Sequence, residues 1–421
     1  MPAAPAAMQP SPKFWLRPVT STRRAVRSAS VTTAPRRFSP RSAASSAGRP
    51  NSRNATMPHS FITERAAISR AAAAVRTVVS ANKAIPVLNN VRIDARDGRV
   101  GLLTTNQDCW AEVTIAAAVN DPFAITVPAA LLEDIARTAP DGAQIELLLT
   151  DTGAAAKSGR ARFRLPTLPS DQFPPLNDHG IEPQLRMKLA DLIAAISAVD
   201  HVKAGDHMSS HQGVLLRAIP GGIECAAFDG NRLSICPAEA VIDGEFVPMT
   251  IPMPVVGKIK SAMAVGVDDI TIGHNGRLAL INGGNARFLT RLVEGKFTEY
   301  WKKLPDTVGE PVLFSARDLS AAMARVGLAQ DQFNSGVAVE LATDSLTLSV
   351  ASQSAGAATD TVMVGYSGEG RKTGFSLQFL RDAVGKCPGD EAELHFDGLG
   401  NAHVFARCPN APRHMVCPMN V

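Results

Sequence analysis

The residues whose types could support catalysis are widely separated in this sequence. His207 and His211 have the i, i+4 spacing of a metal-binding helix, but their segment, KAGDHMSSHQG, is typical of a loop. The glycine pair of NGGNARF (282–288) lies in hairpin-like sequence with no helix after it, and Asp268-Asp269 is typical of a turn before a strand. No P-loop, GxGxxG, HExxH or GxSxG occurs in a suitable context. The sequence therefore predicts a non-catalytic protein without a cofactor or a metal site.

The lysines and arginines are concentrated in segments with helical periodicity. Six such segments hold ten cations against six acids, Glu133, Asp134, Asp191, Asp200, Asp318 and Asp382. The cations are Arg70, Arg76, Arg137, Lys203, Lys258, Lys260, Arg317, Arg325, Arg381 and Lys386. Long flexible cations can hold phosphates without reading bases. The helices thus suit a sequence-independent nucleic-acid surface, and the alternative is an ordinary solvated helix face.

The basic balance of the whole chain comes from its first part. The 421 residues carry a formal charge of +4, but residues 1–57 contain ten basic residues and no acid. The remainder holds 33 basic and 39 acidic residues and is mildly acidic. Rich in Ala, Ser, Pro and Arg, this leader is predicted to be disordered. Three readings stay open: a start misassigned ahead of Met57 or a dispensable tail, an organelle transit peptide, or a functional basic tail.

Cysteine usage and hydropathy exclude further classes of protein. The six cysteines include no CxxC pair, which favours reduced thiols over a disulfide framework or a zinc site. No apolar run approaches the roughly 18 residues that would suggest a membrane span.

One helix-turn-strand pattern occurs three times at equal intervals. VPAALLEDIARTAPDGAQIEL starts at Val127, IPMPVVGKIKSAMAVGVDDITI at Ile251 and FSLQFLRDAVGKCPGDEAELHF at Phe375, so consecutive starts are 124 residues apart. Each copy begins with an apolar helical stripe, continues through a Gly/Asp turn and ends in the alternation of a half-buried strand. An internal triplication of the body follows.

A second helix opens each copy. The segments 64–79, 189–202 and 316–329 are Ala-rich with apolar residues at helical spacing, and short alternating strands such as VLNNVRIDA, GVLLRAI, IECAAF and VAVELA lie between the two helices. Proline-containing linkers follow the first two copies. We predict an α+β fold of three repeats, each with two helices packed on antiparallel sheet. The repeats span 58–180 (repeat 1), 181–307 (repeat 2) and 308–421 (repeat 3).

Three motifs placed in these repeats resemble one known family. FRLPTLPSDQFPPL (163–176), AFDGNRLS (227–234) and the terminal HMVCPMNV (414–421), together with the triplication, resemble the bacterial DNA polymerase III beta subunit, the DNA sliding clamp. The resemblance covers about residues 58–421. It implies a cytoplasmic, nucleoid-associated homodimer that closes head to tail into a ring around duplex DNA. The ring would bind the polymerase III core, the clamp loader and other clamp-binding proteins.

The resemblance also assigns candidate sites. Lys83 falls where clamps carry a basic loop that touches DNA, and Lys203 lies near a second such loop, where Ser209 and Ser210 replace frequent aromatic residues. Phe163 and Leu328 match positions of the chain-to-chain seam. The groove that holds client peptides would contain Phe228, Gly230, Asn231, Arg232, Leu233, Thr298, Lys302, Phe333, Ser376, Phe379, Leu399, Met415, Val416, Pro418 and Met419.

Several groove positions depart from the family pattern. The family commonly has His at Asn231, Leu at His211, Pro at Thr298 and Arg at Asn420, so the preferred peptide is expected to differ. These departures also leave an alternative function: a clamp-derived peptide-binding adaptor that no longer encircles DNA.

Overall fold

The computed structural model of the chain describes residues 59–304, 309–331 and 335–421. The predictions for the leader and for Phe333 therefore fall outside the described residues. Every element considered below lies in the compact unit Thr56–Val421. In the described part no helix is long and apolar enough to cross a membrane.

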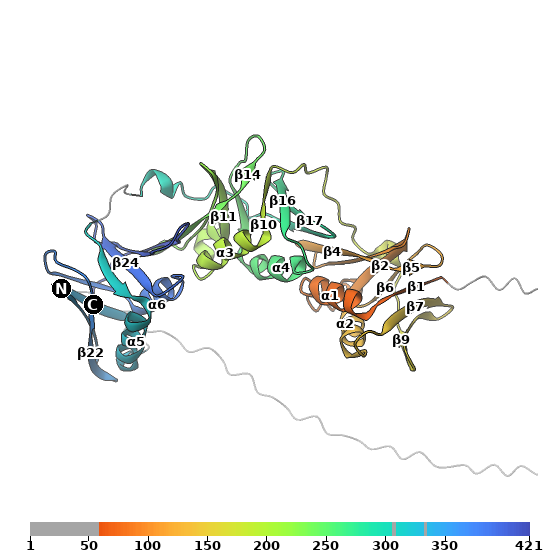
Figure 1. Ribbon diagram of the computed structural model, residues 1–421, viewed down its shortest axis with the longest axis horizontal. Helices are drawn as coiled ribbons and strands as arrows, with labels where there is room; N and C mark the ends of the chain where they lie inside the picture. Colours follow the sequence, from red (N-terminus) through yellow and green to blue (C-terminus); the bar gives the residue numbers. More distant parts are fainter. Residues whose placement is uncertain (1–58, 305–308, 332–334) are drawn as a thin grey trace, which may run out of the picture. The chain divides into compact units, whose positions relative to one another are not determined.

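The described residues form six α-helices at the places where the repeat predicts them (Figure 1). They are α1 (Arg65–Arg76), α2 (Ala129–Thr138), α3 (Leu189–Val199), α4 (Met253–Met263), α5 (Ala316–Val326) and α6 (Leu377–Gly385). The predicted apolar stripe is the buried face, as Leu132 and Ile135 show in α2. Ser315 and Ser376 cap α5 and α6 by accepting the backbone N–H of Asp318 and Phe379, which satisfies donors that a helix start leaves free.

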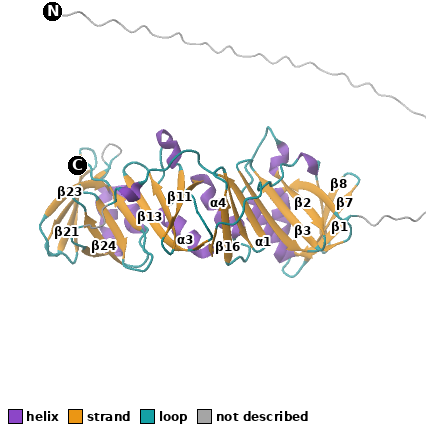
Figure 2. Ribbon diagram, turned by 90° about the horizontal axis from the view of Figure 1, so that it is seen from above, coloured by secondary structure: helices purple, strands orange, loops and turns teal. Residues whose placement is uncertain are grey.

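Strands make up most of the remaining structure (Figure 2) and form four antiparallel sheets in the described residues. The five-stranded sheet has the order β5 (Ala118–Val119), β1 (Ser60–Glu64), β7 (Gln144–Thr150), β8 (Gly153–Ser158), β9 (Ala161–Leu165). The four-stranded sheet has the order β22 (Gly356–Met363), β21 (Ser345–Ser352), β20 (Gly336–Ala342), β23 (Arg371–Ser376).

The two larger sheets contain strands from two repeats each. The nine-stranded sheet runs β14 (Val241–Ile242), β10 (Leu185–Lys188), β16 (Asp269–His274), β17 (Leu278–Gly283), β18 (Ala286–Arg291), β4 (Cys109–Ala116), β3 (Arg99–Thr105), β2 (Asn90–Arg96), β6 (Phe123–Pro128). The eight-stranded sheet runs β15 (Met249–Pro252), β11 (Gly213–Ile219), β12 (Gly222–Phe228), β13 (Arg232–Glu239), β26 (Arg413–Val416), β25 (Ala402–Ala406), β24 (Glu391–Phe396), β19 (Val312–Ser315). The predicted fold class is confirmed, and the sharing of sheets between repeats is new.

The two places where repeats join have the same strand register. Where β18 meets β4, Phe288 lies opposite Ala111, and where β26 meets β13, His414 lies opposite Ser234. In both cases the last strand of one repeat pairs with the fourth strand of its neighbour. β9 is the last strand of repeat 1, and β22 is the equivalent of β4 and β13 in repeat 3. In the described residues each of these two strands pairs on one side only.

The proline-containing segments at the ends of repeats 1 and 2 are packed on the neighbouring sheets. Phe173 of the first is 2% exposed and packs with Val87, Leu103 and partly buried Trp110. Phe297 and Tyr300 of the second pack on Leu215 and Leu233 of the eight-stranded sheet. One expected strand is also corrected: the start of VLNNVRIDA is a 3-10 turn, η1 (Pro86–Asn89), and β2 begins only at Asn90.

Candidate functional site

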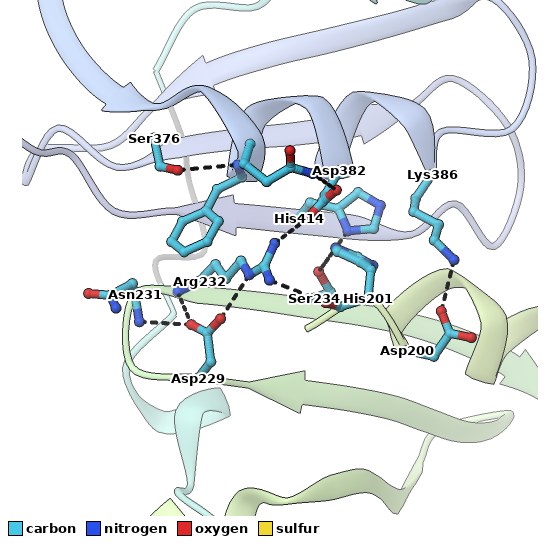
Figure 3. A network of polar contacts seen from close by, with 12 residues as sticks. Asp200, His201, Asp229, Asn231, Arg232, Ser234, Ser376, Asp382, Lys386 and His414 are labelled. Carbon is cyan, nitrogen blue, oxygen red and sulfur yellow. Dashed lines mark hydrogen bonds and ion pairs between the residues drawn. The ribbon is translucent and has the colours of Figure 1, made fainter. Parts of the chain in front are cut away.

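Arg232 on β13 is the centre of the contact between repeats 2 and 3 (Figure 3). Its Nε donates to Asp229 Oδ2 at 2.8 Å, its Nη1 donates to Asp382 Oδ2 on α6 at 2.6 Å, and its Nη2 donates to the carbonyl of His201 at 3.2 Å. The guanidinium carbon lies 4.1 Å from the centre of the Phe379 ring. One side chain therefore holds the β12–β13 turn, α6 and the end of α3 together.

Burial makes the Arg232 contacts sensitive to the loss of either partner. Arg232 is 9% exposed, and the Asp229 side chain is 10% exposed. Removing one member of a buried ion pair strands the other charge away from water, which typically costs about 3–5 kcal/mol. Arg232, Phe379 and the helix cap Ser376 are thus built into the joint, and their predicted contact with a peptide stays a prediction.

Two histidines share one hydroxyl beside this arginine. Ser234 Oγ lies 3.2 Å from His201 Nε2 and 2.9 Å from His414 Nδ1, and the two rings are 5.3 Å apart in an edge-on arrangement. Burial lowers the pKa of His201 to about 4, with the Arg232 charge adding to the effect. Burial likewise lowers the pKa of His414 to about 3, with His201 adding to the effect. Both rings are therefore neutral at pH 7.

Acidification should weaken this joint. Below the ordinary histidine pKa of 6.5 the unfolded chain binds protons at both positions, whereas the folded chain does not until about pH 4. This pair should therefore contribute a fall in stability of up to about 2.7 kcal/mol per pH unit as the pH decreases through that window. Urea unfolding between pH 7.5 and 4.5 measures the slope. His414→Phe/Ser234→Ala, which copies the Phe288–Ala111 pair of the other joint, should reduce the slope by up to about 1.4 kcal/mol per pH unit, and the exposed-site control His207→Gln should not. An unchanged slope in the double variant would refute this role.

Lys386, predicted to face DNA, also joins the two repeats. Its Nζ donates to Asp200 Oδ1 at 2.8 Å and to the carbonyl of Ser197, so it ties the end of α6 to α3. Figure 3 shows this contact beside the histidine pair. Because the ammonium is already occupied, its contact with a phosphate remains a prediction that competes with this bond.

The opposite face of the same sheet carries an apolar floor. Side chains alternate between the two faces of a strand, so Phe228, Leu233 and Met415 lie away from Arg232. Leu233 is opposite both Phe228 and Met415 in the pairing. These residues pack with Phe297, Tyr300, Trp301 and Leu304 of the segment that ends repeat 2. The structure thus gathers three of the predicted apolar groove residues beside an aromatic wall.

A polar network that the sequence did not predict supports this wall. Arg217 Nη2 lies 2.8 Å from Glu224 Oε1, and its guanidinium carbon lies 4.7 Å from the Trp301 ring centre. Tyr300 donates its hydroxyl to the same carboxylate, and burial, followed by the Glu224 charge, raises the pKa of Tyr300 above its usual range. Arg217 and Glu224 are opposite one another across β11 and β12, so their facing positions on a short hairpin were the available signal.

Two of the departures from the family pattern contact each other. His211 Nε2 accepts the Thr298 backbone N–H at 3.1 Å and lies 2.9 Å from Thr298 Oγ1, while its Nδ1 faces Ser210 Oγ at 3.0 Å. The ring is 4.4 Å from Phe297 and 5.7 Å from Phe228, centre to centre. Because Nε2 accepts a hydrogen bond from the Thr298 amide N–H, the ring is neutral, and burial lowers its pKa. This corner of the floor is therefore polar and anchored.

The C-terminal tail runs from the β12–β13 turn of repeat 2 to β23 of repeat 3. Cys417 donates its backbone N–H to the Asn231 carbonyl at 2.9 Å, and Met419 donates its own to the Gly374 carbonyl at 2.9 Å. A side chain at Gly374 would meet Met419 O at 2.4 Å and Val421 at 2.5 Å, so glycine is required for this approach. The tail and the neighbouring strands β20, β21 and β23 line a pocket of about 950 Å³.

The other predicted groove residues are distributed around these features. Leu399 is 85% exposed at the β24–β25 turn and Val416 is 1% exposed in the core. Gly230 has a φ of +94° in the β12–β13 turn, and Lys302 is paired with Glu299 at 2.8 Å. Pro418 and Met419 are exposed. The structure thus brings together the floor, the turn and the tail, while Val416 is covered, as is Leu233 of the floor at 2% exposed.

The predicted DNA-binding cations differ in how free they are. Four form ion pairs: Arg76 with Glu133, Arg137 with Asp134, Arg325 with Asp360, and Lys386 with Asp200. The other seven have no ion pair in the part of the chain that the structure describes, and of these all but the half-buried Lys258 are exposed: Arg70, Lys83, Lys203, Lys258, Lys260, Arg317 and Arg381.

The two predicted seam residues lie at the ends of the repeat array. Phe163 is half-buried on β9. Leu328 is 83% exposed in the short helix η5 (Gly327–Ala329), which packs beside β21 and β22. Phe163 therefore lies on β9 and Leu328 lies beside β22, the two strands proposed to meet at the seam.

Family models agree with this architecture. Residues 59–177 match the N-terminal domain of the DNA polymerase III beta subunit, and residues 302–419 match the C-terminal domain of the same subunit. Together the two matches cover more than half of the chain.

Individual proteins agree along nearly their whole length. A beta sliding clamp of Caulobacter vibrioides is 26% identical over 342 residues, covering 79% of this chain and 92% of that protein. That of Escherichia coli is 26% identical over 370 residues, covering 86% and 100%. A structure of the Pseudomonas aeruginosa DNA polymerase III subunit beta, at 24% identity, has a TM-score of 0.80 and covers 86% of this chain and all of the other. The Bartonella birtlesii sliding clamp bound to griselimycin gives 0.79, with the same coverage.

Proposed function

The chain belongs to the bacterial DNA polymerase III beta subunit family, the DNA sliding clamps, and we propose that it acts as a non-catalytic processivity factor. Two copies close head to tail around duplex DNA, and a groove where repeats 2 and 3 meet tethers the polymerase III core, the clamp loader and other clients. The proposal places the protein in the cytoplasm, with the nucleoid.

The observation that carries this proposal is the shared register of the two internal joints. The strand pairs β18–β4 and β26–β13 use equivalent positions, and β9 and β22 are the unpaired strands of the same two kinds. An unpaired strand edge is a template for another chain. A joint between β9 of one copy and β22 of another repeats the internal pattern, and a heterologous contact of this kind makes a ring when its rotation closes.

The internal joints also supply the register of the proposed seam. Phe163 on β9 is equivalent to Phe288 on β18, because the two residues lie opposite corresponding positions of the preceding strand, Ala156 and Ile281. Ala358 is equivalent to Ala111 by the same counting along β21 and β3. Phe163 would therefore lie opposite Ala358 of the second copy. Exposed Leu328 lies beside β22. Phe163 of one copy and Leu328 of the other would then form an apolar contact across the seam.

The charge of the helices supports the DNA-binding part. The cations without an ion pair occur in or beside helices of all three repeats, and contacts from such side chains to phosphates are independent of sequence. Such contacts allow a protein to slide. The alternative adaptor would keep the groove but would not need a closed ring.

The groove supports the client-binding part. An apolar floor of half-buried Phe228 and Met415 over buried Leu233, bordered by a polar corner at His211 and by the tail, could take a short peptide with apolar side chains. Methionine and phenylalanine fill irregular gaps and suit a surface with several clients. The hydrogen-bonded His211–Thr298 corner would favour a client that offers a polar group there.

Topological trapping on DNA tests the proposal. Protein loaded on a nicked circular plasmid by a clamp loader should stay bound through gel filtration and leave when the plasmid is linearised. Solution mass measurement at micromolar concentration should give a dimer. A strict monomer, or release at equal rates from circular and linear DNA, would contradict the ring and favour the adaptor.

A further inference from the structure

The outer edge of β9 carries a row of arginines without acidic partners. Arg162 and Arg164 point to the same face of the strand, and Arg160 precedes them in the turn. All three are exposed and have no ion pair within the described residues. The neighbouring cation Lys157 is opposite Arg162 and is already bound to Glu146 at 2.9 Å.

The equivalent arginine at the first internal joint is neutralised. Arg287, the residue before Phe288, lies opposite Glu112 of β4 and pairs with it at 3.3 Å. It also pairs with Asp178 of the segment that ends repeat 1. A cross-strand ion pair therefore contributes to that joint.

The equivalent arginine at the second internal joint is held differently. Arg413 donates to His403 Nδ1 at 3.1 Å, and its guanidinium carbon lies 5.2 Å from the Phe405 ring centre. His403 in turn contacts Asp397 at 3.0 Å. Each internal joint thus gives its arginine defined partners.

The strand that would face Arg162 offers hydroxyls instead of acids. In the register of the internal joints Arg162 lies opposite Thr359, and Arg160 lies opposite Thr361. Thr359 and Thr361 form hydroxyl contacts with Ser349 at 3.3 Å and Thr347 at 3.0 Å on β21. The one carboxylate of β22, Asp360, alternates to the other face and pairs with Arg325 of α5. No acid on this face of β22 is therefore placed to meet the arginines.

We propose that the Arg162–Thr359 position determines the strength of the ring seam. The inference rests on the proposed ring. The seam lacks the cross-strand ion pair that Glu112 gives to the first internal joint, and residue 359 decides whether Arg162 forms one. The seam would then be weaker than that joint, and a ring must open somewhere to pass onto circular DNA. A partner chain with an acid at this position would bind the β9 edge more tightly than this chain's own β22 does.

The substitution Thr359→Glu tests the proposal, because it recreates the Arg287–Glu112 pair at the seam. The variant adds one cross-strand pair of opposite charges at each of the two seams of the ring. The dimer dissociation constant should therefore fall about 2- to 30-fold. Opening of a single seam is enough to release the ring from nicked circular DNA, so the lifetime on that DNA should lengthen by about 1.4- to 5-fold. Sedimentation equilibrium and the plasmid assay measure the two effects.

Matched variants separate the ion pair from other causes. Ser349→Glu breaks the same hydroxyl contact and adds the same charge to the same face, but one strand inside the edge, so dimerisation should stay within about 2-fold. Arg162→Gln should leave the parent dimer unchanged and should remove the gain of Thr359→Glu. A gain that persists without Arg162, or no gain in Thr359→Glu, would overturn the proposal while leaving the ring intact. A chain that is monomeric throughout would instead overturn the proposed function.

Discussion

Replacing Arg232 by alanine is expected to cost about 3–5 kcal/mol of unfolding free energy, because Asp229 and Asp382 would lose their buried counter-charge. The loss extends to the groove. Asp229 Oδ1 accepts the backbone N–H groups of Asn231 and Arg232, and the Asn231 carbonyl anchors the tail through Cys417. A looser turn should therefore also weaken client-peptide binding. Urea unfolding and fluorescence anisotropy with a labelled client peptide measure the two effects.

Arg325 supplies the matched control for this prediction. It also forms an ion pair with an aspartate, but its side chain is 61% exposed, and exposed pairs typically contribute about 0–1 kcal/mol. Arg325→Ala should therefore change stability by less than about 1 kcal/mol and leave peptide affinity unchanged. Equal losses in the two variants would show that burial at the joint is not what makes Arg232 important.

The helices and the strands next to them could be predicted from sequence because their signals are local. The stripe that includes Leu132 and Ile135 has the period of a helix, and GVLLRAI and IECAAF match β11 and β12 closely. Local patterns do not say which strand edge meets which. The pairing of β18 with β4 joins residues more than 170 positions apart, and nothing in either strand's own alternation specifies that partner. The domain boundaries, which depend on where such sheets are divided, stay a prediction.

The candidate groove shows the same limit at the level of single residues. Resemblance placed Arg232 and Leu233 together as neighbours in sequence. Adjacent strand residues point to opposite faces, so one lies in the joint with α6 and the other in the apolar floor. The departures at His211 and Thr298 looked independent in the sequence, yet their side chains are hydrogen-bonded. Two substitutions that are distant in sequence can therefore together replace one local contact in the structure.

Charge reversal on the helices should remove most of the DNA retention. Arg70, Lys260 and Arg381 lie on α1, α4 and α6, are exposed and have no ion pair in the described part of the chain. Arg76 is a poorer choice because Glu133 already pairs with it. Converting all three to glutamate removes up to six phosphate contacts from a ring of two copies. The slope of log affinity against log salt should then flatten by up to about 5, since each contact contributes about 0.9.

The control must change charge equally without touching the helices. Arg99→Glu/Arg277→Glu/Lys303→Glu alters three exposed cations in turns and strand ends, also without ion pairs in the described residues. Retention on nicked circular DNA across a salt series should be close to that of the parent for this triple, whereas the helix triple should lose at least about 100-fold at physiological salt. Both triples should still dimerise. If they lost retention to the same extent, net charge rather than the helical surface would hold the DNA, and the predicted cation set would be wrong.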